Sequence, residues 1–166
     1  MNEEWFPIVN NQGKIVGKAR RSVCHNSTSM LLHPVVHLHL FNKSGKLFLQ
    51  KRAMTKDIQP GKWDTSVGGH IGLGERIEDA LIRETKEELG LTKFKPQFLV
   101  SYIWESARER ELVNSFSATS WEIPVINKDE IEEGKFWSFS EIKENLGKEI
   151  FTPNFEHEFN MLFIIK

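Results

Sequence analysis

Three glutamates, Glu84, Glu87 and Glu88, lie close together near the middle of the chain. The apolar periodicity of residues 77–89 predicts a helix that ends at Gly90. On a helical wheel, Glu84 and Glu88 fall one turn apart on the apolar side. Like charges at this spacing repel and burial penalises them further, so a divalent cation such as Mg²⁺ or Mn²⁺ would compensate them. The alternative is a solvated acidic face, which is common on glutamate-rich helices.

The loop before this helix is rich in glycine. Four of its residues are Gly68, Gly69, Gly72 and Gly74. Such a loop lets the backbone approach a ligand closely and present N–H or C=O groups to it. Arg83 precedes Glu87 by four residues, a spacing at which the guanidinium can hold that carboxylate. Together these features favour a bound cation over a solvated face.

Residues 69–91 read GHIGLGERIEDALIRETKEELGL and resemble the Nudix box. That box reads Gly, five residues, Glu, seven residues, then Arg-Glu-aliphatic-x-Glu-Glu-x-Gly-aliphatic. The matching positions are Gly69, Glu75, Arg83, Glu84, Glu87, Glu88, Gly90 and Leu91. Only Thr85 departs, standing where an aliphatic residue is usual, and its β-branched side chain fills much of the same space. So many fixed residue types at fixed offsets are far more specific than a lone glycine motif.

The resemblance implies a fold and a reaction. Nudix domains are α/β/α sandwiches, so we expect residues 1–166 to form a single α/β (α+β) domain with a mixed sheet. In that family the box binds Mg²⁺ or Mn²⁺, and water attacks a phosphorus of a diphosphate joined to another group. The partner expected from the resemblance is therefore a small-molecule diphosphate, such as a nucleoside diphosphate linked to another moiety.

The family's functional residues carry over position by position. The metal ligands and catalytic groups would be Glu84, Glu87 and Glu88. The backbone carbonyl of Gly69 would be a further ligand. The residues that stabilise the loop–helix–loop would be Glu75, Arg83 and Gly90. The general base stays open between Glu84 and an acidic residue outside the box, for which the candidates are Asp129, Glu130, Glu132 and Glu133; the simpler interpretation of that acidic run is a solvated loop.

Residues 46–70, KLFLQKRAMTKDIQPGKWDTSVGGH, resemble the Nudix branch related to isopentenyl-diphosphate isomerase. There, a matching Arg and Lys contact the diphosphate, which implies substrate contacts for Arg52 and Lys56. The isomerase metal site matches His33, His70, Glu109 and Glu111, and His70 is a candidate metal or phosphate contact. The isomerase has an essential Cys where this chain has Gly68, and it tends to lose the acidic box residues that this chain keeps. We therefore favour a hydrolase over an isomerase-like enzyme or a non-catalytic diphosphate-binding module.

The remaining histidines and tryptophans have simpler interpretations. His37 and His39 alternate with apolar residues on a predicted strand, so they face the same side, expected to be solvated or partly covered. The alternative is that they line a substrate pocket. His25 and His157 are expected at the surface. Trp63 and Trp104 are expected to fill the core rather than stack on a base.

The elements that position these residues can be outlined from turns and periodicity. We expect hairpins at 5–19 and at 35–50, and a short extended stretch over 64–67. Further strands are expected at 98–104, 112–121 and 135–139. Ser138 and Glu141 form a potential capping box for a short helix. Thr152-Pro153 should start a C-terminal helix, 152–166, whose Phe155, Phe159 and Leu162 dock on the body. The N-terminal extension, 1–25, is expected to pack Trp5 and Phe6 on the body or on the second subunit of a homodimer.

Composition limits the remaining classes. The chain has 166 residues, 22 Lys plus Arg and 23 Asp plus Glu, for a net charge of −1. This balance argues against a protein that coats a nucleic acid polymer or an anionic membrane. The single cysteine, Cys24, excludes a disulfide within the chain. We expect a protein of a reducing, cytoplasmic compartment, with no apolar run near the ~20 residues that span a bilayer.

Overall fold

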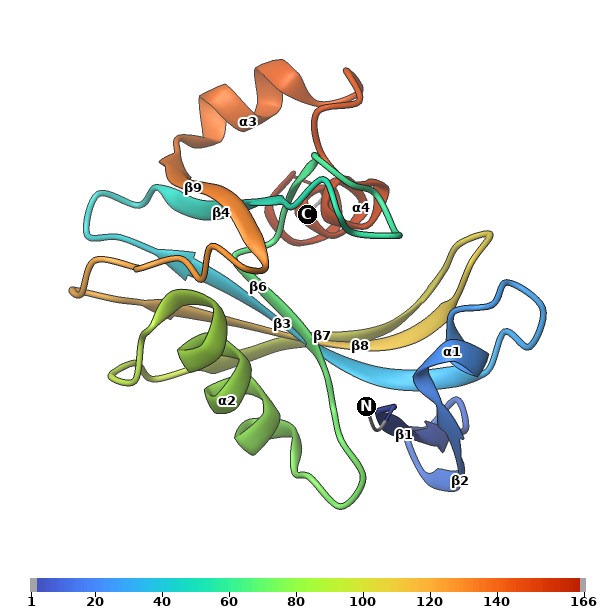
Figure 1. The fold of residues 1–166 in the computed structure, drawn as a ribbon. Coiled ribbons are helices and arrows are strands. Elements are labelled where there is room, and N and C mark those ends of the chain that lie inside the picture. Colours follow the sequence, from blue (N-terminus) through green and yellow to red (C-terminus); the bar gives the residue numbers. More distant parts are fainter. Residues whose placement is uncertain (1–2, 165–166) are drawn as a thin grey trace.

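The computed structural model describes residues 3–164, which form a mixed sheet with helices on both sides (Figure 1). The strands are β1 (Trp5–Val9), β2 (Ile15–Arg20), β3 (Leu32–Phe41), β4 (Leu47–Arg52), β5 (Trp63–Asp64), β6 (Val67–His70), β7 (Gln97–Glu105), β8 (Arg110–Thr119) and β9 (Ile131–Trp137). The helices are α1 (Arg21–Cys24), α2 (Ile77–Leu89), α3 (Phe139–Asn145) and α4 (Pro153–Phe159), with a π-helical turn, η1 (Asn160–Ile164). The predicted sandwich of α/β/α type with an N-terminal hairpin is confirmed.

Strand β3 is the centre of the sheet. It pairs in parallel with β8 along its whole length and antiparallel with β6. Strand β4 pairs with β9 and β5 instead and meets β3 only where Phe41 faces Leu47. The predicted turn at 42–45 therefore forms, with the Gly45 N–H donating to the Asn42 carbonyl, but the expected hairpin does not extend beyond it. The two strands diverge and leave space between them.

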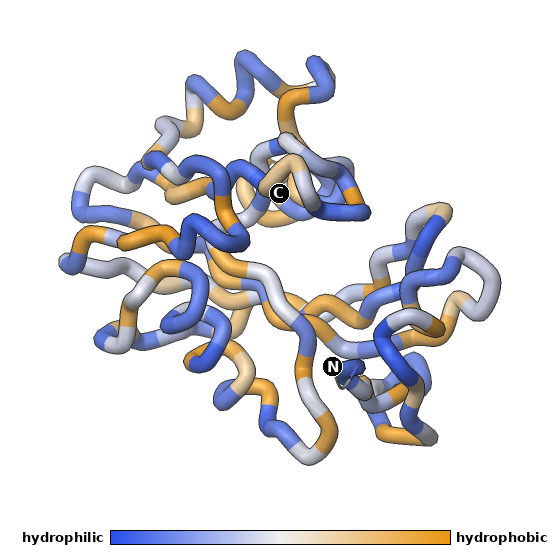
Figure 2. Tube along the Cα trace, in the orientation of Figure 1, coloured by the Kyte–Doolittle hydropathy of each residue, from blue (hydrophilic) through white to orange (hydrophobic). Residues whose placement is uncertain are grey.

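The alternation of residues along β3 separates two packed layers. Val36, Leu38 and Leu40 face a core that includes Ala80 and Leu81 of α2. Across the sheet, a second core joins β4 and β9 to the helices α3 and α4, with Phe155 and Phe159 fully buried. In Figure 2, apolar colouring gathers along the central strands, and polar and apolar residues alternate along the helices. Each face of the sheet is thus covered by the apolar side of helices, as expected for a sandwich.

Local signals set the helix ends. Gly90 adopts the left-handed conformation at the end of α2, with φ of 66°. Ser138 and Glu141 form the predicted capping box of α3, and the Thr152 side chain accepts from the Phe155 N–H at the start of α4. Leu162, predicted on the buried face, is only half-buried in η1. The prediction for the C-terminal helix covers residues 165–166, and that for the extension covers 1–2, which lie outside the described residues.

The N-terminal hairpin forms as predicted and packs on the body of this chain. Phe6 and Ile8 of β1 are buried with Ala19 of β2 and with Cys24, which lies in the unpredicted helix α1. Among the described residues, no helix has both the length and the apolar character needed to cross a bilayer.

Candidate active site

A cavity of about 790 Å³ opens where β3 and β4 diverge. Its wall combines residues from β3, β4, β6, β8, α2 and the N-terminal hairpin. The box glutamates Glu84, Glu87 and Glu88 all line it, and so do Arg52, Lys56 and His70. The structure therefore gathers the predicted ligands and the predicted substrate contacts around one space.

The three box glutamates differ in exposure. Glu87 is exposed, Glu84 is partly buried, and Glu88 is only 4% exposed. The Gln50 side chain donates to Glu88 Oε1 at 2.6 Å and to the Ser66 carbonyl at 3.0 Å, which fixes the Glu88 carboxylate from β4. The solvated-face alternative thus fails for Glu88 and holds for Glu87.

Of the two less exposed carboxylates, Glu84 is paired with Arg83, and Glu88 has no cationic partner within residues 3–164. Desolvation raises the pKa of Glu84, against the lowering effect of its hydrogen bonds to Glu88 and Arg83. Desolvation and then the neighbouring Glu84 raise the pKa of Glu88 well above its usual range. Carboxylate oxygens are hard donors, and a crowded, buried group of them is suited to bind a divalent cation such as Mg²⁺ or Mn²⁺.

Arg83 organises the loop and the helix. Its guanidinium donates to both oxygens of Glu75, at 2.8 and 3.0 Å, and to Glu84 at 2.8 Å. It also reaches Glu87 at 3.3 Å. Glu75 in turn accepts from the Gly72 N–H at 2.9 Å, so the loop is tied to the helix. This planar fork fixes the position of each carboxylate, and its positive charge offsets the repulsion between them.

Gly69 has to be a glycine because of Glu84. A Cβ placed on Gly69 would overlap the Cγ and Cδ atoms of Glu84. The missing side chain lets the carboxylate lie directly against the backbone of β6. This close approach brings the backbone of Gly69 and the Glu84 side chain to the same region of the cavity wall.

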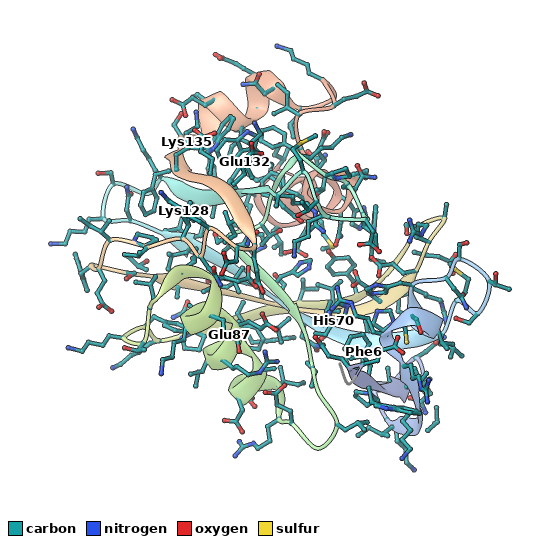
Figure 3. All side chains as sticks on the ribbon, viewed as in Figure 1. Phe6, His70, Glu87, Lys128, Glu132 and Lys135 are labelled. Carbon is teal, nitrogen blue, oxygen red and sulfur yellow. The ribbon has the colours of Figure 1, made fainter. Side chains whose placement is uncertain are left out.

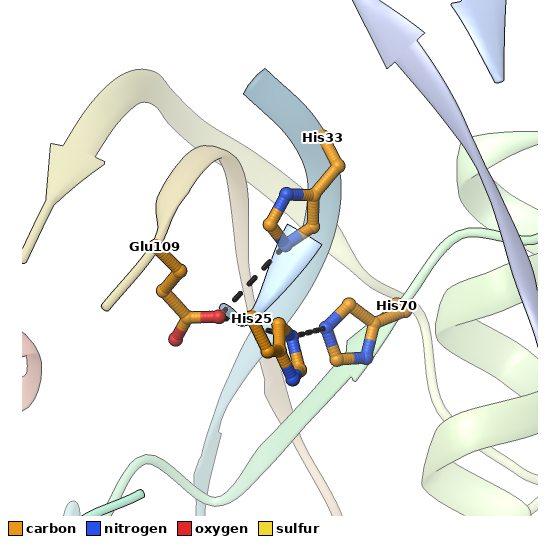
Figure 4. Close-up of side chains that lie close together, drawn as sticks. All are labelled: His25, His33, His70 and Glu109. Atoms are coloured by element: carbon orange, nitrogen blue, oxygen red, sulfur yellow. Dashed lines mark hydrogen bonds and ion pairs between the residues drawn. The ribbon is translucent and has the colours of Figure 1, made fainter. Parts of the chain in front are cut away.

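A second group of potential ligands includes three residues that line the cavity, His25, His70 and Glu109 (Figure 4). It consists of His25, His33, His70 and Glu109, whose ligand atoms all lie within 4.8 Å of one another. His25 Nε2 lies 3.2 Å from His70 Nε2 and 3.0 Å from Glu109 Oε2. Glu111 Oε2 lies 3.9 Å from His33 Nε2. The prediction that His25 is a surface residue was wrong: it is 7% exposed and belongs to this group.

The donor set fits a metal ion. Within residues 3–164, His33 Nε2 is buried without a hydrogen-bond partner, an arrangement that costs free energy unless something binds this atom. His33 Nδ1 contacts the Leu31 carbonyl at 3.0 Å, which leaves Nε2 free to act as a ligand. Desolvation lowers the pKa of both His33 and His70, which keeps their rings neutral and able to coordinate.

The N-terminal hairpin closes this second group. Phe6 stacks on the His70 ring with centroids 4.2 Å apart and an angle of 8° between the planes. Figure 3 shows Phe6 and His70 side by side at the hairpin, with Glu87 on α2. A residue far away in the sequence thus fixes the orientation of a potential ligand.

Arg52 and Lys56 line the cavity from β4 and the loop after it. Arg52 donates to the Ile58 carbonyl at 2.9 Å and to Asp64 at 3.3 Å, so its guanidinium is held in place before any substrate binds. Of the acidic run, Glu130 lines the cavity, and Asp129, Glu132 and Glu133 are exposed. Trp63 is buried in the core as predicted, but Trp104 lines the cavity.

The strongest difference from the sequence prediction concerns His37 and His39. Both are buried rather than solvated, and both contact the fully buried carboxylate of Glu158 on α4. The alternative prediction, that they line a pocket, holds for His37 and not for His39. Ser115 and Tyr102 donate to the same carboxylate. Glu158 was not singled out from the sequence, although its place beside Phe159 and one turn after Phe155 puts a carboxylate on an apolar helix face. That is the same anomaly that marked Glu84 and Glu88.

Comparisons with known proteins agree with this geometry. The model of the NUDIX domain family matches residues 31–155. An isopentenyl-diphosphate Delta-isomerase of Shigella boydii is 32% identical over 148 residues, covering 86% of this chain and 81% of the relative. The uncharacterised Nudix hydrolase SCO1686 of Streptomyces coelicolor is 29% identical over 158 residues, covering 92% and 84%. The crystal structure of DR0079 from Deinococcus radiodurans has the same fold, with a TM-score of 0.82 at 22% identity, covering 96% of this chain and 99% of that one.

Proposed function

The chain belongs to the Nudix family, and from this premise we propose that it hydrolyses a diphosphate linkage with Mg²⁺ or Mn²⁺ bound by Glu84, Glu87 and Glu88. The substrate class we propose is a nucleoside diphosphate joined to another group. One observation carries the proposal: the three carboxylates converge on the wall of the cavity beside Gly69. Arg83 pairs with Glu84 and Glu87, whereas the buried Glu88 has no cationic partner within residues 3–164.

The residues of the chain divide the work. Arg83 and Gln50 hold Glu84 and Glu88 in fixed positions. Arg52 and Lys56, on the cavity wall, are suited to bind the negatively charged oxygens of the diphosphate. A divalent cation bound at the glutamates would neutralise the diphosphate and lower the pKa of the attacking water. Glu84 or Glu130 would accept the proton of that water, since both line the cavity.

A hydrolysis panel with a matched pair of variants tests the proposal. The panel contains nucleoside di- and triphosphates, nucleotide sugars, ADP-ribose, dinucleotides and isopentenyl diphosphate, each with and without Mg²⁺. Glu88→Gln should lower kcat by about 10² or more on any substrate that is turned over. Glu78→Gln, at the exposed start of the same helix, should leave kcat unchanged. Absence of turnover by the folded protein on every substrate, or equal activity of the two variants, would contradict the proposal.

A second candidate function is an isomerase-like reaction on a prenyl diphosphate. The group formed by His25, His33, His70 and Glu109 favours it, as does the likeness to an isopentenyl-diphosphate isomerase. Gly68 counts against this candidate. It lies on the cavity wall at the position of the cysteine in the isomerase, and it has no side chain to transfer a proton. Conversion of isopentenyl diphosphate without release of phosphate would support this candidate over hydrolysis.

A further inference from the structure

Among the residues that contact the Glu158 carboxylate directly, one lines the cavity. Glu158 lies on α4 with no exposed surface, and it accepts from His37 Nδ1 at 2.9 Å and from Ser115 Oγ at 2.7 Å. Tyr102 and His39 also contact it. Of these partners, His37 is the one that lines the cavity. The imidazole ring of His37 therefore joins the buried carboxylate directly to the cavity wall.

The ring of His37 has two edges with different surroundings. Nδ1 donates to Glu158, so it is not available to a ligand. The opposite edge faces Gly68: a Cβ on Gly68 would lie 3.6 Å from His37 Cδ2 and 3.9 Å from Nε2. His37 and Gly68 are register partners of β3 and β6, and both line the cavity. Because Gly68 has no side chain, the Nε2 edge is left uncovered.

We propose that His37 is an anion-binding residue of this cavity, in which Nε2–H donates to a phosphate oxygen of the diphosphate and Glu158 is the positioning residue that orients the ring. The inference rests on the proposed function only for the identity of the ligand as a diphosphate. It adds a contact from the floor of the cavity to those expected from Arg52 and Lys56.

The electrostatics agree with a donor at Nε2. Burial by itself would lower the pKa of His37, but the Glu158 carboxylate overrides this effect and raises the pKa to about 9. The charges of Asp64 of β5 and Glu111 of β8 act on the pKa of His37 in the same direction. A ring that already donates from Nδ1 then also carries a proton on Nε2 at neutral pH, so it presents a cationic donor. An anion is the ligand that such a group selects.

Two substitutions at His37 distinguish the contribution of Nδ1 from that of Nε2. The side-chain amide of His37→Asn can take the place of Nδ1 and keep the bond to Glu158, but it lacks the Nε2 edge. The amide of His37→Gln can take the place of Nε2 and keep an uncharged donor at the cavity, but it loses Glu158. If His37 has a purely structural role, His37→Gln should reduce pyrophosphate affinity more than His37→Asn does, because it loses the bond to Glu158. If His37 contacts the phosphate, His37→Asn should reduce pyrophosphate affinity more than His37→Gln does, because it lacks the Nε2 donor.

The test is calorimetric binding of inorganic pyrophosphate in the presence of Mg²⁺, which requires no turnover. We expect His37→Asn to weaken binding by about tenfold or more, and His37→Gln to weaken it less. Thermal unfolding should rank the two variants in the opposite order. His39→Gln, which keeps a donor to Glu158 but does not line the cavity, should bind pyrophosphate as the wild type does.

Two results would overturn the inference. One is unchanged pyrophosphate affinity in His37→Asn. The other is a loss of affinity in His39→Gln as large as that in His37→Asn, because it would show that the network acts only on the fold. Gly68→Ala gives a further check, since its methyl group makes ordinary contacts but covers the Nε2 edge, and it should weaken binding without loss of stability. If pyrophosphate binds in this manner and no substrate is hydrolysed, the proposed hydrolysis fails and the anion contact stands.

Discussion

The guanidinium of Arg83 donates from Nη2 to the backbone carbonyl of His70 at 3.0 Å. The two residues belong to different groups of potential ligands, because Arg83 holds the box glutamates and the His70 ring lies with His25 and His33. The end of β6 is therefore fixed by the same guanidinium that fixes the carboxylates. A substitution of Arg83 should therefore displace residues of both groups.

Arg83→Lys should lower both stability and activity. A lysine ammonium cannot donate to Glu75, Glu84 and the His70 carbonyl at the same time, since it lacks the planar fork. We expect a loss of about 1–2 kcal/mol of unfolding free energy, a modest value because the guanidinium is partly exposed. Urea unfolding measures this loss, and Arg76→Lys, at the exposed N-terminal end of the same helix, is the control. Equal midpoints for the two variants would contradict the role given to the guanidinium.

Gly69→Ala should separate activity from stability. The added Cβ overlaps the Glu84 side chain, and Glu84 can rotate away because its atoms belong to a flexible chain rather than to the backbone. We expect the melting temperature to fall little and kcat to fall by about 10² or more, because the proposed metal ligand Glu84 would lose its position. Gly17→Ala, where a Cβ meets nothing within 4 Å, is the matched control. Full activity of Gly69→Ala would show that the position of Glu84 is not critical.

His33→Asn should weaken metal binding at the second group of ligands. The Nε2 atom of His33 is buried and unpartnered within residues 3–164, so a bound ion would satisfy it. A ligand that binds the folded state raises the melting temperature. We expect Mn²⁺ or Zn²⁺ to stabilise the wild type and to stabilise His33→Asn less. The control is His157→Asn at an exposed position; an equal metal-induced shift in all three proteins would argue against a site here.

The pairing of His37 with Glu158 should make stability depend on pH. The pKa of His37 is raised from 6.5 to about 9, so its stabilisation is complete below pH 6.5 and is lost as the pH rises through 9. The pKa of Glu158 is lowered by His37 and His39 despite desolvation, so its contribution is present above about pH 4.5 and is lost on acidification. The pair therefore stabilises the folded protein most between about pH 4.5 and pH 6.5.

The measurement is the unfolding free energy at pH 6.5 and pH 9.5. The wild type should lose on the order of 1–3 kcal/mol more than His37→Asn over this interval, because the variant has no ring to deprotonate. Parallel pH profiles for the two proteins would show that the imidazole does not carry this dependence.

The local features of the fold could be predicted because each depends on residues close in sequence. Glu84 and Glu88 lie one helical turn apart whatever the rest of the chain does, so their conflict with an apolar face is visible in the sequence. The capping box of Ser138 with Glu141 and the start of α4 at Thr152 are local in the same way, and both form as predicted. The sequence therefore determined the box helix, its acidic side and the family to which the chain belongs.

Only the tertiary structure decided what lies opposite those residues. His25 joins His33 and His70 because β3, β6 and the N-terminal hairpin converge, and no local spacing encodes that convergence. Glu158 meets His37 across 121 positions of sequence. Such contacts depend on strand register and on how α4 packs across the sheet, which are set by the burial of apolar surface from the whole chain. The sequence names the groups that do chemistry, and the fold decides which of them share a cavity.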